Sequence, residues 1–175
     1  MIPETVIALA NLERRRRGDT EPRAPLAQAV RARRALAEVG LSVDGLTDRD
    51  LPALTRLVRA VSALGNSLAL QCELPSSAVE VINKLASGCR ATAKLTVRGK
   101  APRTDVDWHD PNPAAALARR VIQELGQVDS TRLRQCQRTG CDLLFFDPTR
   151  SRSRRWHAEQ PCGWLERQHR RRAQG

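Results

Sequence analysis

Four residues near the C-terminus have the types and the spacing of a metal-binding site. They are Cys136, Cys141, His157 and Cys162, and they form the pattern C-x4-C-x15-H-x4-C. Thiolate and imidazole ligands in two close pairs are what a tetrahedral Zn²⁺ ion requires, and four protein ligands leave no position open for water. The pattern therefore predicts one structural zinc ion that stabilises folding, rather than a catalytic metal.

Two other interpretations of this pattern stay open. His169 could replace His157 or Cys162 as a ligand, and the four residues could also have no common role. The matched x4 spacing favours the set with His157. Gly140 and Gly163 support it further, because glycine gives the backbone freedom that tight metal-binding turns need.

The other two of the five cysteines, Cys72 and Cys89, have no partner at ligand spacing. We expect both to be buried apolar thiols. An odd number of cysteines in this arrangement does not indicate a disulfide framework.

The segment around the predicted zinc site carries much of the positive charge. The chain has a net charge of +11, from 30 basic and 19 acidic residues. Residues 129–175 contain eleven arginines and five acidic residues, a net +6. A basic surface organised by zinc is typical of nucleic-acid binders, because guanidinium groups bind phosphates. The candidate phosphate-binding residues are Arg150, Arg152, Arg154, Arg155, Arg167, Arg170, Arg171 and Arg172.

A solvated basic face, or contact with acidic residues of the N-terminal part, would explain the same arginines without nucleic acid. The chain has only two Phe, three Trp and no Tyr. This scarcity argues against a single-strand or RNA binder that relies on aromatic stacking. The polyanions that this leaves as possible partners include double-stranded DNA.

The rest of the chain predicts helices that surround one hairpin. Apolar residues recur at helical spacing over residues 25–40, 47–68, 77–88 and 112–125. Residues 91–108 instead alternate apolar and polar, which predicts a β-hairpin with one buried face. We expect a mainly α (α+β) protein with a helical domain at 1–128 and a small treble-clef-like zinc module with a basic C-terminal helix at 129–175. Too few apolar residues lie in 129–175 for a stable core without metal.

Other classes of protein fit the sequence poorly. No apolar run is long enough to span a membrane. Near the N-terminus an apolar stretch precedes Arg14 to Arg17, which is the reverse of the order in a signal peptide, so we expect a cytoplasmic protein. We find no nucleophile–base pair, phosphate-cradling glycine-rich loop or paired-carboxylate motif, and this favours a binding protein over an enzyme.

The C-terminal segment resembles the CGNR-type zinc finger. The resemblance covers about residues 130–172 and rests on the ligand spacing, on Leu143 to Asp147, on the run from Thr149 to Trp156, and on Gly163 after the last ligand. Such fingers end bacterial proteins that carry an N-terminal ABATE domain and are described as stress-induced transcription regulators. The resemblance implies zinc held by Cys136, Cys141, His157 and Cys162, and a DNA-binding role.

The sequence departs from that family in two places. The third ligand is usually Cys and is His157 here, which zinc accepts equally well. The Cys-Gly-Asn-Arg motif reads Cys162-Gly163-Trp164-Leu165, so two apolar residues replace the Asn and Arg.

Three functions follow as hypotheses. The first is a zinc-containing DNA-binding transcription regulator whose helical domain forms a homodimer or binds a small effector. The second is a small-molecule-binding protein or biosynthetic enzyme with a pocket between the helical domain and the finger, for which Trp108, His109 and Trp164 are candidate lining residues. The third is an adaptor that binds a protein partner through Trp164 and Leu165.

Overall fold

The computed structural model describes residues 2–14 and 25–173, and Arg15 to Arg17 lie outside these ranges. The helices are α1 (Glu4–Asn11), α2 (Ala29–Glu38), α3 (Leu51–Leu70), α4 (Ser76–Ala86), α5 (Pro113–Leu125) and α6 (Trp164–Ala173). The strands are β1 (Arg90–Arg98), β2 (Ala101–His109), β3 (Leu133–Gln135) and β4 (Leu144–Phe146). Three short helical turns are η1 (Asp48–Asp50), η2 (Ser130–Arg132) and η3 (Glu159–Gly163). The expectation of a mainly helical protein with a hairpin and a small zinc module is confirmed.

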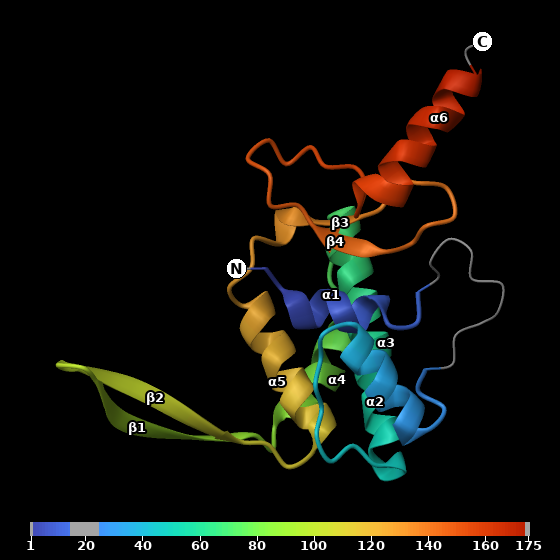
Figure 1. The fold of residues 1–175 in the computed structure, drawn as a ribbon. Helices are drawn as coiled ribbons and strands as arrows, with labels where there is room; N and C mark the ends of the chain where they lie inside the picture. Colours follow the sequence, from blue (N-terminus) through green and yellow to red (C-terminus); the bar gives the residue numbers. More distant parts are fainter. Residues whose placement is uncertain (1, 15–24, 174–175) are drawn as a thin grey trace.

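Helices α1, α4 and α5 pack directly against α3, and α2 lies beside them and adds Ala32 and Leu36 to the same apolar core (Figure 1). The apolar stripe predicted for α3 is buried, with Leu54, Leu57, Val58 and Val61 fully enclosed. Local sequence sets where the helices begin. The Asp50 carboxylate accepts from the backbone N–H and the hydroxyl of Thr47 before α3, and Asn112 caps α5 by accepting from the N–H of Ala115 at 2.9 Å.

Helix α1 is capped by a residue far away in the sequence. The Glu124 carboxylate, near the end of α5, accepts hydrogen bonds from the backbone N–H groups of Thr5 and Val6, each at 2.9 Å. A carboxylate at this position satisfies orphan donors and complements the helix dipole. It therefore fixes α1 against α5 and completes the helical body, by which we mean residues 2–14 and 25–128 without the hairpin.

The C-terminal module, residues 129–173, sits on one end of the helical body. Leu144 of β4 is buried within the main apolar core, and a Cβ at Gly65 of α3 would lie only 2.4 Å from its Cδ1 atom. The Asn11 side chain donates to the Leu144 carbonyl and accepts from its N–H, both at 2.8 Å. Gly65 of α3 thus leaves room for the Leu144 side chain, and the Asn11 amide at the end of α1 binds the Leu144 backbone. Together they hold β4 against the helical body.

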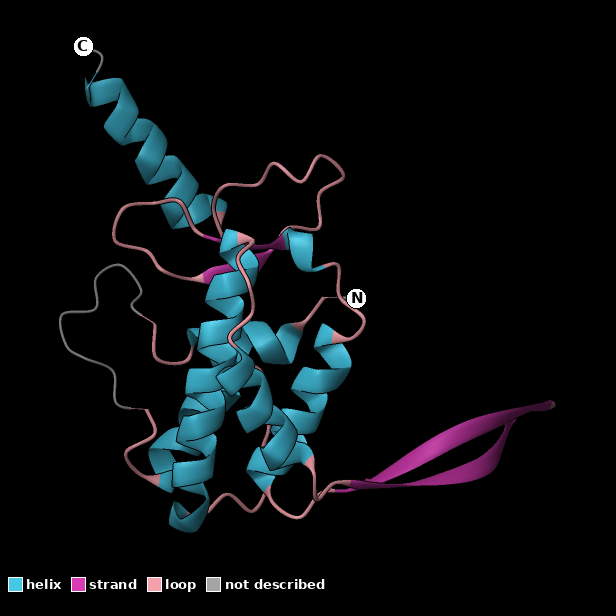
Figure 2. Cartoon of the chain, turned by 180° about the vertical axis from the view of Figure 1, so that it is seen from behind, coloured by secondary structure: helices cyan, strands magenta, loops and turns pink. Residues whose placement is uncertain are grey.

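Strands β1 and β2 form a hairpin, here called the arm, that projects away from the helices (Figure 1). Its register pairs Arg90 with His109 and Arg98 with Ala101. The predicted hairpin is present, but the expectation of a buried face is wrong: apart from the half-buried Thr96 and Asp107, its residues are exposed. Two views show the reason, because no helix among the described residues covers either face of the arm (Figure 2).

Candidate metal centre and nucleic-acid interface

The first ligand pair is positioned by the small hairpin of β3 and β4. The backbone N–H of Cys136, just after β3, donates to the Leu143 carbonyl at 2.9 Å. The chain then turns back through Gly140, whose φ of +76° is in the left-handed region that favours glycine. This turn brings Cys141 beside Cys136, as the short spacing predicts.

The second pair lies at the entrance to α6. His157 precedes η3, and Cys162 lies in the last turn of η3, where both Cys162 and Gly163 are buried. Gly163 is needed here for close packing and not for a positive φ. A Cβ at this position would lie 2.6 Å from Glu159 Oε2 and 3.0 Å from the Trp156 ring.

The structure brings the four predicted ligands together. Their ligand atoms all lie within 4.8 Å of one another, and the three cysteines are buried while His157 is half-buried. The Cys141 Sγ atom is 3.6 Å from His157 Nδ1, close to the edge of about 3.5 Å that Zn–S and Zn–N bond lengths give in a tetrahedron. The group is therefore placed to bind a single zinc ion. His169 is exposed on α6 and does not belong to the group.

Burial and close spacing of the cysteines determine how readily the Cys141 and Cys162 thiols lose their protons. Burial raises the pKa of the Cys141 thiol, and its neighbour Cys136 adds to the effect. Burial together with Cys136 and Cys141 raises the pKa of Cys162 to about 12. The thiols of Cys141 and Cys162 therefore stay protonated at neutral pH unless a cation replaces their protons. A closed Cys₃His site of this kind supplies structural cohesion and leaves no open position for a substrate.

Asp147 organises the loop that follows β4, although the sequence analysis did not single it out. Its carboxylate is fully buried and accepts from the N–H and the hydroxyl of Thr149 and from the N–H of Arg154, at 2.9, 2.6 and 2.8 Å. Burial opposes ionisation, but these hydrogen bonds outweigh it and hold the pKa of Asp147 below its ordinary value. The spacing of Asp147 and Thr149 is the only local sequence signal, that of an Asx turn.

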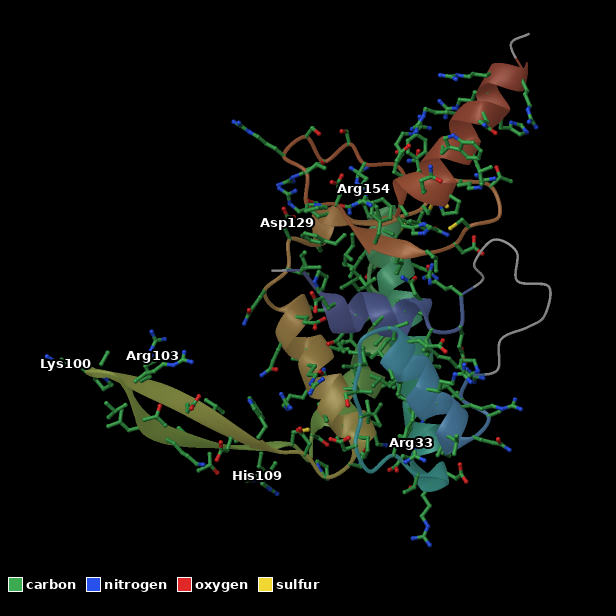
Figure 3. All side chains as sticks on the ribbon, viewed as in Figure 1. Arg33, Lys100, Arg103, His109, Asp129 and Arg154 are labelled. Carbon is green, nitrogen blue, oxygen red and sulfur yellow. The ribbon has the colours of Figure 1, made fainter. Side chains whose placement is uncertain are left out.

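Arg154 turns inward and supports the zinc site. Its guanidinium donates to the Trp156 carbonyl at 2.8 Å and to the carbonyl of the ligand His157. It also lies 5.5 Å from the centre of the Phe145 ring. Figure 3 shows Arg154 within the module. We therefore assign Arg154 to holding the ligand loop, whereas the sequence predicted it as a phosphate contact.

The other seven predicted phosphate-binding arginines are exposed, and they differ in their partners. Arg152 pairs with Asp129 at 2.9 Å, Arg167 with Glu159, and Arg170 with Glu166 at 3.6 Å. Arg155 donates to the neutral Gln137 side chain. Within the described residues, Arg150, Arg171 and Arg172 have no ion-pair partner, so these three cations are fully available to a ligand.

The geometry separates the three residues suggested for a pocket. Trp108 and His109 end β2 at the base of the arm, and Trp164 begins α6. A pocket of about 640 Å³ does lie between α3 and the C-terminal module, but other residues line it. These are Ala69, Leu70, Gln71, Thr131, Leu133, Arg134, Gln135, Cys136, Gln137, Arg152 and Arg154.

The two cysteines outside the zinc site differ from each other. Cys89 is half-buried and donates to the Ala115 carbonyl at 3.5 Å. Burial and the nearby Asp110 carboxylate raise its pKa to about 11, so it stays a thiol at neutral pH. Cys72, just after α3, is exposed, so the expectation that it is buried is wrong.

Comparison with known proteins agrees with the geometry of the module. Residues 132–174 match the family model of the CGNR zinc finger. A search of curated proteins finds no match to the chain. None of the helices in the described residues is long and apolar enough to cross a bilayer. The zinc ligands, the Asp147 loop and α6 all lie inside the matched region.

Proposed function

We propose that the chain is a cytoplasmic, zinc-organised regulator of transcription that binds double-stranded DNA through its C-terminal module. One observation carries this proposal. Helix α6 leaves the module and points away from the helical body (Figure 1), with none of its ten residues buried and with Arg170, Arg171 and Arg172 in its last turn. A helix with no apolar face to pack and a free basic end is suited to a polyanion.

The dimensions of α6 suit this role. Ten residues make a helix about 15 Å long, and the major groove of B-DNA is about 12 Å wide, which admits an α-helix. Because the zinc ligand Cys162 lies directly before α6, the metal would fix the direction in which the helix points. Zinc would thus affect DNA binding only by holding α6 in the orientation that contacts DNA.

The loop of residues 149–155 supplies a second phosphate-binding element. Asp147 fixes its backbone from inside, while Arg150 and the hydroxyls of Ser151 and Ser153 face solvent. Hydroxyl and guanidinium groups are the side chains that most often position a protein on the DNA backbone. Trp164 and Leu165 stand in place of the Asn and Arg of the family motif, so contacts would come from the loop and from the far end of α6.

The experiment compares two double variants that remove the same charge. In Arg171→Ala/Arg172→Ala, we expect weaker binding to a short duplex and a salt dependence of log K reduced by about 2, since each lost phosphate contact reduces it by about 0.9. The matched control is Arg31→Ala/Arg33→Ala on α2, where both side chains are also exposed. Equal losses in both variants, or no binding of the unmodified protein at low salt, would contradict the proposal.

The pocket between α3 and the module favours a second function, binding of a small anionic effector. Arg134, Arg152 and Arg154 all contribute to its lining. The Nε atom of Arg134 is buried without a hydrogen-bond partner, and it forms an ion pair at 3.9 Å with Asp147. The lining offers no nucleophile–base pair, and its one thiol, Cys136, is a zinc ligand. The composition of the lining therefore supports binding rather than catalysis. Inorganic phosphate should raise the melting temperature at constant ionic strength, and Arg152→Ala should abolish this rise. No shift with phosphate would exclude the anion site.

A further inference from the structure

The arm carries a continuous apolar face that the described chain leaves uncovered apart from Arg119 of α5, which contacts Trp108 at its base. On one side of the two strands lie Ala91, Ala93, Leu95 and Val97 of β1 and Pro102, Thr104, Val106 and Trp108 of β2. The large members are strongly exposed, with Leu95 at 78%, Val97 at 71%, Val106 at 45% and Trp108 at 41%. The charged residues of both strands all project from the opposite side, since side chains alternate along a strand.

Such an arm requires a covering partner. An isolated two-stranded hairpin is at best marginally stable in water, and it needs further strands or packing against another surface. Period-two alternation of apolar and polar residues is the pattern of a strand with one buried face. Because none of the described helices buries this face, we look to another molecule for the burial that the pattern indicates.

The base of the arm is held so that it points outward. Arg119 of α5 makes a double hydrogen bond to the Asp110 carboxylate, at 2.8 and 2.7 Å, and both side chains are largely buried. The same guanidinium lies 4.4 Å from the centre of the Trp108 ring. These contacts join the end of β2 to α5 and keep the arm directed away from its own body.

The shape of the apolar face fits a second copy of itself. From tip to base the residues of β1 become smaller, from Val97 and Leu95 to Ala93 and Ala91, whereas those of β2 become larger, from Pro102 to Trp108. When two arms stack face to face in antiparallel directions, each strand lies over its own equivalent in reverse order. Large residues then meet small ones along both strands, and we propose that this face forms a two-fold symmetric dimer.

Size favours the antiparallel arrangement. Nine residues make a strand about 30 Å long, and stacked sheets lie about 10 Å apart. Antiparallel arms place the two helical bodies at opposite ends of the stacked pair, whereas parallel arms would place both bodies at the same end. The two strands contribute no charged side chain to the face, and the Arg119 guanidinium of α5 reaches it only at Trp108. Lys100 and Arg103 lie toward the tip of the arm (Figure 3). At the base Asp107 already pairs with Lys94 and Asp110 with Arg119, so charge does not decide the arrangement.

The contact area predicts a reversible dimer. Two faces of about 30 by 10 Å bury a total area below that of standard stable interfaces, about 1,200–2,000 Å². We therefore expect a monomer–dimer equilibrium in which the fraction of dimer rises as the protein concentration increases from micromolar to millimolar. The dimer needs no nucleic acid, so it stands or fails separately from the proposed function.

Sedimentation velocity over that range tests the proposal with a matched pair of variants on one strand. Leu95→Lys places a charge on the apolar face, and because Leu95 is largely exposed the monomer should fold normally. Thr92→Lys places the same charge on the opposite face, where Thr92 is also exposed. We expect Leu95→Lys to be monomeric at every concentration and Thr92→Lys to dimerise like the unmodified protein. Circular dichroism and zinc content confirm that each variant is folded.

Thiol cross-linking tests the face directly. In a Cys72→Ser background, a bifunctional maleimide should link two copies of Thr104→Cys, on the apolar face, but not two copies of Thr92→Cys. An unmodified protein that stays monomeric at millimolar concentration overturns the proposal. A dimer that survives Leu95→Lys, or that cross-links through Thr92→Cys alone, overturns it as well.

Discussion

The helical body and the C-terminal module are stabilised by different forces. The body buries a cluster of more than twenty residues, mostly Leu, Val and Ala, whereas the core of the module consists of Cys136, Cys141, Leu143 and Cys162, with Trp156 packed against it. Three of those five residues are zinc ligands. Burial of apolar surface therefore dominates in the body, to whose core the module adds Leu144, while we expect the rest of the module to depend on the metal and on buried polar contacts.

Removal of zinc should have the largest effect and should separate the two regions. Structural zinc sites contribute on the order of 10–16 kcal/mol of apparent free energy. We expect Cys141→Ser, or treatment with a strong chelator, to unfold the module while most helical circular dichroism remains. Fluorescence from Trp156 and Trp164 should report the change. Simultaneous loss of all helical signal would show that the body also depends on the metal.

A cavity in the body should have the second-largest effect and should leave the metal site intact. Leu57 is fully buried at the centre of α3. Leu57→Ala should lower the free energy of unfolding by about 2–5 kcal/mol, measured by urea denaturation. Zinc content should stay unchanged, and Leu51→Ala, at a half-buried position of the same helix, should cost much less. Loss of zinc in Leu57→Ala would mean that the two regions are not independent.

One carboxylate in each region can be neutralised by mutation, Asp147 in the module and Asp110 in the body. We expect the larger loss of stability from the change in the module. Asp147→Asn keeps the shape but removes the charge that three donors share. Because the group is fully buried, we expect a loss of about 1–3 kcal/mol and weaker zinc retention, measured by competition with a chelator. Unchanged stability and zinc affinity would show that the charge of Asp147 does not hold the loop in place.

The corresponding change in the body, Asp110→Asn, should be the smallest, about 1 kcal/mol. The hydrogen bonds from Arg119 hold the pKa of Asp110 below its ordinary value. Its contribution is therefore present at neutral pH and is lost as the pH falls through the folded-state pKa. The difference in melting temperature between the unmodified protein and Asp110→Asn should shrink toward zero at acid pH. A constant difference across that range would exclude an ionised Asp110.

Sequence patterns predicted what depends on local spacing. The zinc ligands and the stripe on α3 follow from fixed separations along the chain, and both are confirmed. Contacts between distant residues were not predictable: nothing near Asn11 indicates that its amide pairs with Leu144, and nothing near Glu124 indicates that it caps α1.

Two differences between the expectations and the structure have physical reasons. Arg154 lies in an arginine-rich run, and composition does not reveal that its backbone and guanidinium both point toward buried acceptors. Apolar and polar residues alternate along the arm as they do in a hairpin with one buried face. This pattern indicates that one face is to be covered, but it does not indicate which molecule covers it.

The decisive measurement is the binding of the unmodified protein to one short duplex, with zinc and after its removal. We propose that zinc fixes a module whose free arginines contact phosphates. The zinc-loaded protein should bind at low salt, with log K falling linearly with log salt concentration, and removal of zinc should abolish most of the affinity. Equal binding in both states, or no binding in the zinc-loaded state, would contradict it.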